Sequence, residues 1–235
     1  MTKRRLLIGA PLALVVALVI AAGLYVLMNS RTYQVAGRIV PRVDTDRKIV
    51  ALTLDDGPTA YTPEVLKALA DAGIPATFYL VGRELAADPD LGAAIARAGH
   101  EIGNHSFTHR RMILVGADTV REEIEHTDAE IAKTGYRGVI TFRPPNGKKL
   151  FALPRYLADH DRTTVMWDVE PDSGKRPTTA EIVSETVERV RPGSIVLLHT
   201  MYESGAASRA AIGPIVAELR ARGYEFVTVA QLLAE

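Results

Sequence analysis

Two adjacent carboxylates, Asp55 and Asp56, follow an apolar run that is typical of a buried strand. Gly57 and Pro58 come next, so the pair lies where such a strand would turn. A solvated turn explains two aspartates. So does a reaction site in which one carboxylate binds a metal ion and the other accepts a proton. Other residues at the same edge of the fold are needed to choose between these interpretations.

A pair of histidines lies in the segment HSFTH, at His105 and His109. Residues with this spacing share one face of a helical turn and can hold one metal ion. Most such pairs are accidental surface neighbours. Joined by an aspartate at a strand end, the pair becomes a set of two histidines and one carboxylate. That set leaves coordination positions open, which is a catalytic arrangement.

The elements that would position these groups alternate along the chain. Apolar runs alternate with amphipathic segments that stop at a glycine, which favours parallel strands joined by right-handed crossovers. Seven such units without internal repeats predict an α/β fold, a distorted (β/α)7 barrel rather than an open sheet. The expected strands are Lys48–Leu54, Ala76–Val81, Glu101–Asn104, Val139–Phe142, Thr163–Val169, Ser194–Leu198 and Phe226–Val229. The expected helices are Thr62–Ala72, Asp90–Ala98, Ala117–Thr134, Thr179–Val190 and Ile212–Ala221.

In a barrel, catalytic groups belong at the carboxyl ends of the strands. The aspartates close the first expected strand, and His105 follows the third. Arg143 follows the fourth, Trp167 closes the fifth, and His199 follows the sixth. We therefore expect these side chains to meet at one rim.

The segments TLDDGP, HSFTH, RPPNG, WDVEPD and LLH occur in this order. In order and spacing they resemble the motifs of the polysaccharide deacetylase family, the NodB-homology domain of carbohydrate esterase family 4. The resemblance covers about Arg47 to Leu233 and implies removal of N- or O-acetyl groups from sugar polymers. It implies a divalent metal ion, usually zinc, with cobalt or nickel as other choices. The implied roles are Asp55 as general base, Asp56, His105 and His109 as metal ligands, Arg143 as the arginine that orients the base, the backbone N–H of Asn146 beside Pro145 as oxyanion donor, and His199 as general acid.

Two positions depart from the family pattern. Asn146 stands where an aromatic residue commonly precedes the glycine of the third motif. Asp172 is followed by Ser173 instead of a tryptophan, and its spacing from Trp167 is one residue short. A nearby carboxylate would keep His199 protonated, and Asp172 is the candidate. Trp167 either lines the site or is a core aromatic residue.

The first 30 residues differ from the rest of the chain. Lys3, Arg4 and Arg5 precede an unbroken apolar run over residues 6–28. At ~1.5 Å per residue this run would be roughly 35 Å long as a helix, which exceeds a hydrocarbon core of about 30 Å. It predicts one transmembrane helix with the domain outside the cytoplasm. A cleaved export signal is the alternative. Residues 31–46 are expected to be a juxtamembrane linker, and residues 47–235 the deacetylase domain.

Composition limits the possible partners. The chain has 28 basic and 28 acidic residues and no cysteine, so thiolate metal sites and disulfides are excluded. Beyond residue 30, 25 basic residues face 28 acidic ones, and nucleic-acid binding is not expected. We expect a metal-dependent deacetylase that acts on an N-acetylated glycan such as peptidoglycan or a chitin-type polymer. An O-acetyl-glycan esterase and a catalytically silent glycan-binding domain are the alternatives.

Overall fold

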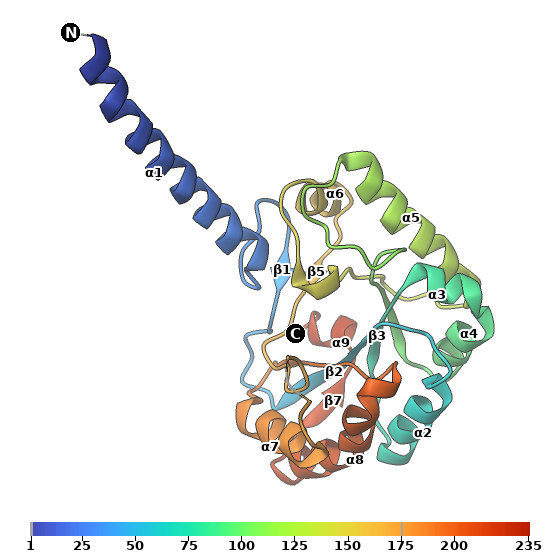
Figure 1. Ribbon diagram of the computed structural model, residues 1–235. Helices are drawn as coiled ribbons and strands as arrows, with labels where there is room; N and C mark the ends of the chain where they lie inside the picture. Colours follow the sequence, from blue (N-terminus) through green and yellow to red (C-terminus); the bar gives the residue numbers. More distant parts are fainter. Residues whose placement is uncertain (1, 175) are drawn as a thin grey trace.

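The protein consists of an α/β body from which one long helix projects (Figure 1). The computed structural model describes residues 2–174 and 176–235, with side chains described from residue 13 onward. The projecting helix is α1 (Thr2–Asn29). In the described part of the chain, no helix is long and apolar enough to cross a membrane. This finding does not support the predicted transmembrane helix over residues 6–28, whose first side chains, up to residue 12, lie outside those described.

A parallel sheet forms the centre of the body. Its middle strand is β2 (Ile49–Asp55), in which every residue is buried. The strand order is β4-β3-β2-β6, and β7 pairs with the start of β2. The bounds of these strands are β3 (Thr77–Leu80), β4 (Glu101–Asn104), β6 (Ile195–Leu198) and β7 (Glu225–Val227). Burial on both faces explains why β2 and β6 have largely apolar sequences.

Short pairings connect the two edges of this sheet. Phe142 bridges Asn104 of β4 and Thr164 of β5 (Thr164–Val165), and Val169 bridges Val196 of β6. All three bridges are parallel, as expected for a distorted barrel. The strand predicted over 139–142 is reduced to the bridge at Phe142, and the strand predicted over 163–169 is largely replaced by extended loop.

The segment predicted as a linker, residues 31–46, contributes a strand. Ile39 and Val40 form β1, which pairs in parallel with β5. Val40 is buried, and its carbonyl accepts a hydrogen bond from the N–H of Met166 at 2.8 Å. The chain just after α1 therefore reaches the strand that leads into Trp167.

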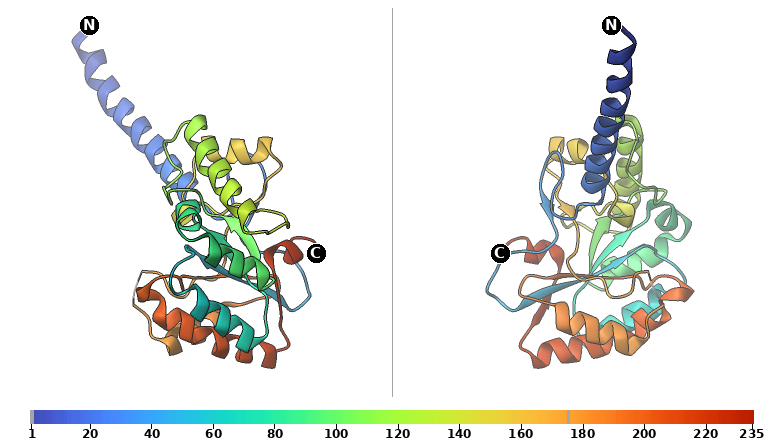
Figure 2. Two further views of the ribbon diagram at one scale, coloured as in Figure 1. Left: turned by 90° about the vertical axis from the view of Figure 1, so that its right-hand side faces the viewer. Right: turned by 60° about the vertical axis from the view of Figure 1, so that its left-hand side comes forward.

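Helices cover the outside of the barrel. In Figure 2, α2, α7 and α8 lie together below the sheet, where α8 contacts both α2 and α7. The helices are α2 (Thr62–Ala72), α3 (Gly82–Ala87), α4 (Pro89–Arg97), α5 (Ala117–Lys133), α6 (Ala152–Asp159), α7 (Thr179–Arg189), α8 (Ala206–Ala221) and α9 (Val229–Leu232), with short 3₁₀ turns at Pro145–Gly147 and Glu203–Gly205.

Several of these helices differ from the prediction. The short helices α3, α6 and α9 are not among the predicted helices, and α9 begins at Val229, the last residue of the predicted strand Phe226–Val229. Helix α8 begins at Ala206 instead of Ile212 and continues through Pro214. A proline is favoured only in the first turn of a helix, so a helix that extends eight residues before Pro214 is not expected from the sequence. The extension matters because it brings Ser208 and Arg209 of α8 next to the chain around His199.

Candidate active site

The carboxyl ends of the parallel strands place the predicted groups at one rim. Asp55 is the last residue of β2, His105 follows β4, and His199 follows β6. The register aligns these ends, since Leu54 is paired with both Phe78 and Leu198. The sheet pairing therefore places the carboxyl ends of β2, β4 and β6 at one edge of the sheet.

Asp55 is held by a buried arginine. Arg143 has no exposed surface, and its NH1 donates to Asp55 Oδ1 and to Thr53 Oγ1, each at 2.7 Å. The remaining guanidinium N–H groups donate to the carbonyls of Val165 and Met166. A buried arginine with all these acceptors fixes the orientation of the Asp55 carboxylate.

Asp56 and the two histidines form a separate cluster. One ligand atom from each of Asp56, His105 and His109 lies within 4.8 Å of the others, an arrangement that could hold a metal ion. His109 Nε2 lies 3.2 Å from Asp56 Oδ1, and His105 Nε2 lies 3.6 Å from Asp55 Oδ2. His105 is buried, whereas Asp56 and His109 are partly exposed. The cluster is thus open on one side.

The helical turn predicted for HSFTH is wrong. The segment is a loop, in which Ser106 and His109 have φ values of 67° and 58°. The left-handed backbone at Ser106 and His109, instead of helical spacing, brings the imidazole centroids of His105 and His109 to 5.0 Å. The two histidines still share one site, but for a conformational reason that their spacing does not reveal.

The tautomer of His105 suits a metal ligand. Its Nδ1 lies 2.7 Å from the carbonyl oxygen of Arg143, and a carbonyl can only accept a hydrogen bond. Nδ1 therefore carries the proton, and in the neutral ring Nε2 presents its lone pair to the cluster. Burial lowers the pKa of His105, although the charges of Asp55 and Asp56 oppose this shift. The donor set of one carboxylate and two neutral imidazoles fits zinc or a similar divalent ion.

His199 faces the cluster with a carboxylate behind it. His199 Nδ1 lies 3.0 Å from Asp172 Oδ1, and its backbone N–H donates to Asp172 Oδ2 at 2.6 Å. Ser208 donates to the same oxygen at 2.7 Å. Burial by itself lowers the pKa of His199, but the hydrogen bond and charge of Asp172, together with the charges of Asp55 and Asp56, raise it to about 9. The expected pairing of Asp172 with His199 is present despite the short spacing.

The third-motif loop carries the expected oxyanion residue. Asn146 has φ 55° and ψ 18°, a left-handed conformation that asparagine tolerates, and it lies between the buried residues Pro145 and Gly147. Its side-chain oxygen accepts a hydrogen bond from Arg111 Nε at 3.0 Å. Trp167 is only 4% exposed. A Cβ on Gly147 would lie 3.2 Å from the Trp167 ring, so Trp167 packs beneath this loop as a core aromatic residue.

Four supporting residues were not singled out as site residues from the sequence. Thr53 positions Arg143, and Asn104 Oδ1 accepts from the N–H of Ser106 at 2.8 Å. Glu123 accepts from the backbone N–H and the hydroxyl of Thr108 at 2.7 and 2.5 Å. Arg209 donates to the carbonyls of two residues that follow His199. Glu123 lies in a charged run that is typical of a solvent face, yet it is buried.

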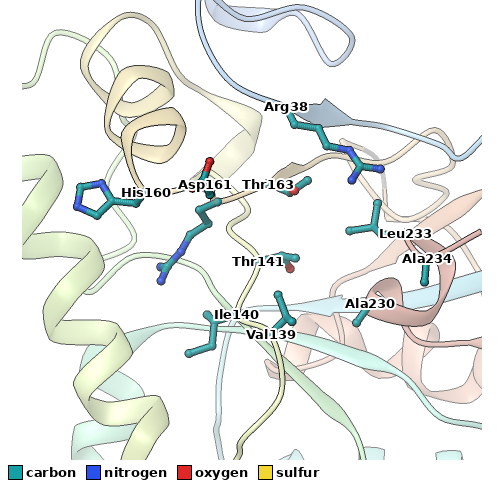
Figure 3. Close-up of a pocket in the computed structure, with 11 residues that line it drawn as sticks. Arg38, Val139, Ile140, Thr141, His160, Asp161, Thr163, Ala230, Leu233 and Ala234 are labelled. Carbon is teal, nitrogen blue, oxygen red and sulfur yellow. The ribbon is translucent and has the colours of Figure 1, made fainter.

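Two cavities differ in whether predicted site residues line them. One of about 590 Å³ is lined by His199, Asp172 and Ser208, together with residues 203–207. The other, about 400 Å³, is lined by residues that include Arg38, Thr141, Thr163 and Ala230 (Figure 3). The cavity in Figure 3 includes none of the predicted site residues, and neither cavity is lined by Asp55, Asp56, His105 or His109.

Comparisons with known proteins agree with this geometry. Residues 42–165 match the family described as Polysaccharide deacetylase. A peptidoglycan-N-acetylglucosamine deacetylase of Bacillus cereus is 34% identical over 203 residues, covering 84% of this chain and 93% of that protein. The crystal structure of the Bc1960 peptidoglycan N-acetylglucosamine deacetylase superposes with a TM-score of 0.78 at 28% identity, covering 81% of this chain and 90% of that one. A CE4 family pseudoenzyme from Bacillus anthracis gives a TM-score of 0.76 at 28% identity, covering 84% and 69% of the two chains.

Proposed function

Because this chain belongs to the polysaccharide deacetylase family, we propose that it hydrolyses the acetamido groups of an N-acetylated glycan in a metal-dependent reaction. The observation that carries the proposal is the juxtaposition of three groups at one rim. These are the Asp56–His105–His109 cluster, the Asp55–Arg143 pair and the His199–Asp172 pair. Amide hydrolysis needs an activated water, a proton acceptor and a proton donor, and this rim supplies a candidate for each.

Asp56, His105 and His109 are the residues that would hold the ion. When bound there, a divalent ion supplies polarisation of the acetyl carbonyl and a lowered pKa of the attacking water. Its identity as zinc is part of the proposal, supported by the mixed nitrogen and oxygen donors. Asp56 is engaged with the cluster, so it does not serve as a free base.

Asp55 is the proposed general base. Its Oδ1 is fixed by Arg143, while Oδ2 faces His105 and the open side of the cluster. This arrangement leaves one oxygen to take the proton of the attacking water. The backbone N–H of Asn146 is the proposed donor to the tetrahedral oxyanion, a contribution that is typically worth ~3 kcal/mol. Pro145 fixes the backbone on one side of that donor.

His199 is the proposed general acid. Attack of water on the acetyl carbon is followed by cleavage of the C–N bond, and the amine nitrogen must take a proton as it leaves. A pKa of about 9 keeps His199 protonated near neutral pH, and Asp172 stabilises the imidazolium from behind. A cavity of about 590 Å³ adjoins this histidine on the side of Asp172 and Ser208.

The proposed substrate is a glycan outside the cytoplasm, with peptidoglycan first and chitin-type polymers second. The name of the Bacillus cereus relative supports peptidoglycan. The basic cluster Lys3–Arg5 before the apolar run of residues 6–28 supports export, with that run as a membrane anchor or a cleaved signal. Fractionation of cells that express the full chain would locate the protein.

Acetate release tests the proposal. The full chain should release acetate from N-acetylglucosamine oligomers or purified peptidoglycan with added zinc, and a chelator should stop the release. His199→Ala should lose turnover and keep its metal. Release only from O-acetylated xylan would identify an O-acetyl esterase instead.

A silent glycan-binding domain is the second candidate, favoured by the pseudoenzyme neighbour and by Ser173 in the fourth motif. Glycan binding with bound metal and no acetate release from any acetylated glycan would identify this alternative.

A further inference from the structure

Three consecutive residues at the end of α1, Asn29, Ser30 and Arg31, contact two loops of the proposed active site. Asn29 Oδ1 and the carbonyl of Ser30 accept hydrogen bonds from Lys148 and Lys149, respectively. Arg31 NH2 lies 2.6 Å from Glu170 Oε2. The lysines directly follow the loop of Asn146, and Glu170 precedes Asp172. This short segment, residues 29–31, therefore bridges the loop of the proposed oxyanion donor and the loop that supports the proposed acid.

Arg31 covers the only tryptophan of the chain. Its guanidinium carbon lies 4.4 Å from the centroid of the Trp167 ring, within the range of a cation–π contact. Arg143 lies over the same ring at 5.4 Å. Trp167 is thus in contact with one arginine that fixes Asp55 and another that comes from the N-terminal segment.

Glu170 connects Arg31 to the loop of Asp172. Its Oε2 also accepts from Trp167 Nε1 at 2.7 Å, and its Oε1 accepts from Ser173 Oγ at 2.5 Å. Glu170 therefore holds the start of the loop through Trp167 and the residue after Asp172 through Ser173. The serine that departs from the family pattern has a defined role here, since its hydroxyl ties the end of the loop to the carboxylate that Arg31 neutralises.

We propose that Arg31 is a positioning residue for the deacetylation reaction. Through Trp167 and Glu170 it holds residues 167–173 in the conformation that places Asp172 behind His199. This inference rests on the proposed function and goes beyond it, because it assigns to residues 29–31 a part in the active-site architecture. It predicts a loss in kcat with little change in KM, since Arg31 acts on the orientation of the proposed acid.

Trp167 gives a readout that does not depend on activity. As the only tryptophan, it is the source of all tryptophan fluorescence of the chain. In the full-length protein, Arg31→Ala should expose one face of the ring and raise acrylamide quenching about twofold, with a red shift in emission. Arg31→Lys keeps the charge opposite Glu170 and should restore part of both effects. Arg38→Ala is the matched control, because Arg38 is an exposed arginine in the same N-terminal segment.

The kinetic test uses the same variants on an N-acetylglucosamine oligomer with zinc. Arg31→Ala should lower kcat about tenfold and change KM less than about twofold, with zinc content unchanged. Glu170→Gln should have a similar effect, and the double variant should lose no more than the single ones. Arg38→Ala should match the parent chain in fluorescence and kcat.

The outcomes separate this inference from the proposed function. Unchanged quenching and kcat in Arg31→Ala would overturn the inference, and so would an equal loss in Arg38→Ala or additive losses in the double variant. If Arg31→Ala does not fold, Arg31→Lys and Glu170→Gln carry the same test. Absence of acetate release from the parent chain would instead count against the proposed function, while the quenching experiment would still test the contact.

Discussion

Replacing Asp172 by asparagine tests how the acid is kept protonated. The carboxylate is almost fully buried, with its side chain 3% exposed, and it faces both the ring and the backbone N–H of His199. Asparagine keeps the shape but removes the charge, and it turns one of the two acceptor positions into a donor. The pKa of His199, now raised to about 9, should therefore fall toward its ordinary value, because burial lowers it while the charges of Asp55 and Asp56 still raise it.

The expected size of the effect depends on pH. At pH 7.5 a histidine with a pKa of about 9 is ~97% protonated, whereas one with a pKa of about 6.5 is ~9% protonated. If the protonated form is the acid, kcat of Asp172→Asn should be about tenfold below the parent chain at pH 7.5. The deficit should grow to roughly 80-fold at pH 8.5 and almost vanish at pH 5.5. The deficit in kcat grows with pH because the raised pKa keeps His199 protonated to a higher pH in the parent chain than in the variant.

The assay is acetate release from an N-acetylglucosamine oligomer, with kcat measured from pH 5.5 to 9 for both proteins. The ratio of the two kcat values removes pH effects that the proteins share. Zinc content is measured in parallel, and Ser208→Ala serves as control because it removes a hydrogen bond to Asp172 but keeps the charge. A loss that is the same at every pH, or a ratio near one at pH 8.5, would refute the assignment of Asp172 as the group that keeps His199 protonated.

Three further variants test the remaining roles. Asp55→Asn should lower kcat about 1000-fold with zinc retained, and loss of the metal instead would show that Asp55 is a ligand. His109→Ala should weaken zinc binding by at least about 100-fold in competition with a chelating dye, and an unchanged affinity would remove His109 from the site. Asn146→Gly keeps the backbone N–H and tolerates the left-handed φ of 55°, so kcat should stay within about threefold of the parent chain. A much larger loss would show that the asparagine side chain takes part.

The rim could be predicted because parallel strands bring their carboxyl ends together. The largely apolar sequences of β2 and β6 indicated buried strands, with Asp55 as the last residue of β2 and His199 directly after β6. The pairing of Leu54 with Leu198 then aligns the two ends. This part of the prediction needs no side-chain geometry, because a parallel sheet by itself brings the carboxyl ends of its strands to one edge.

The conformation of the metal-binding loop could not be predicted in this way. Spacing indicated a helical turn for His105 and His109, but the positive φ at Ser106 and His109 is set by surrounding contacts. Glu123 supplies one of these contacts from α5, through two hydrogen bonds to Thr108. Its acidic neighbours in the sequence suggested solvent exposure, and only the packing of α5 on the loop shows that it is buried.

The predicted strand Val139–Phe142 is also absent because of its surroundings in the fold. Val139 is 68% exposed, and only Phe142 of the expected fourth strand forms a bridge. A run of four apolar or β-branched residues meets the sequence criterion for a strand, but the neighbouring strand β5 has only two residues to pair with. Backbone pairing between neighbouring strands is therefore sparse here. Beside Phe142, the Arg143 guanidinium donates to the carbonyls of Val165 and Met166.

The two adjacent aspartates differ in role because the backbone changes between them. Successive residues of a strand point to opposite sides, so a continued strand at Asp56 would direct the second carboxylate away from the first. Strand β2 ends at Asp55, and Asp56 has φ 73°, in the left-handed region. That turn leaves Asp55 against Arg143 and places Asp56 Oδ1 3.2 Å from His109. The proposed division between proton acceptor and metal ligand thus depends on one backbone conformation at the strand end, which adjacency in the sequence alone does not specify.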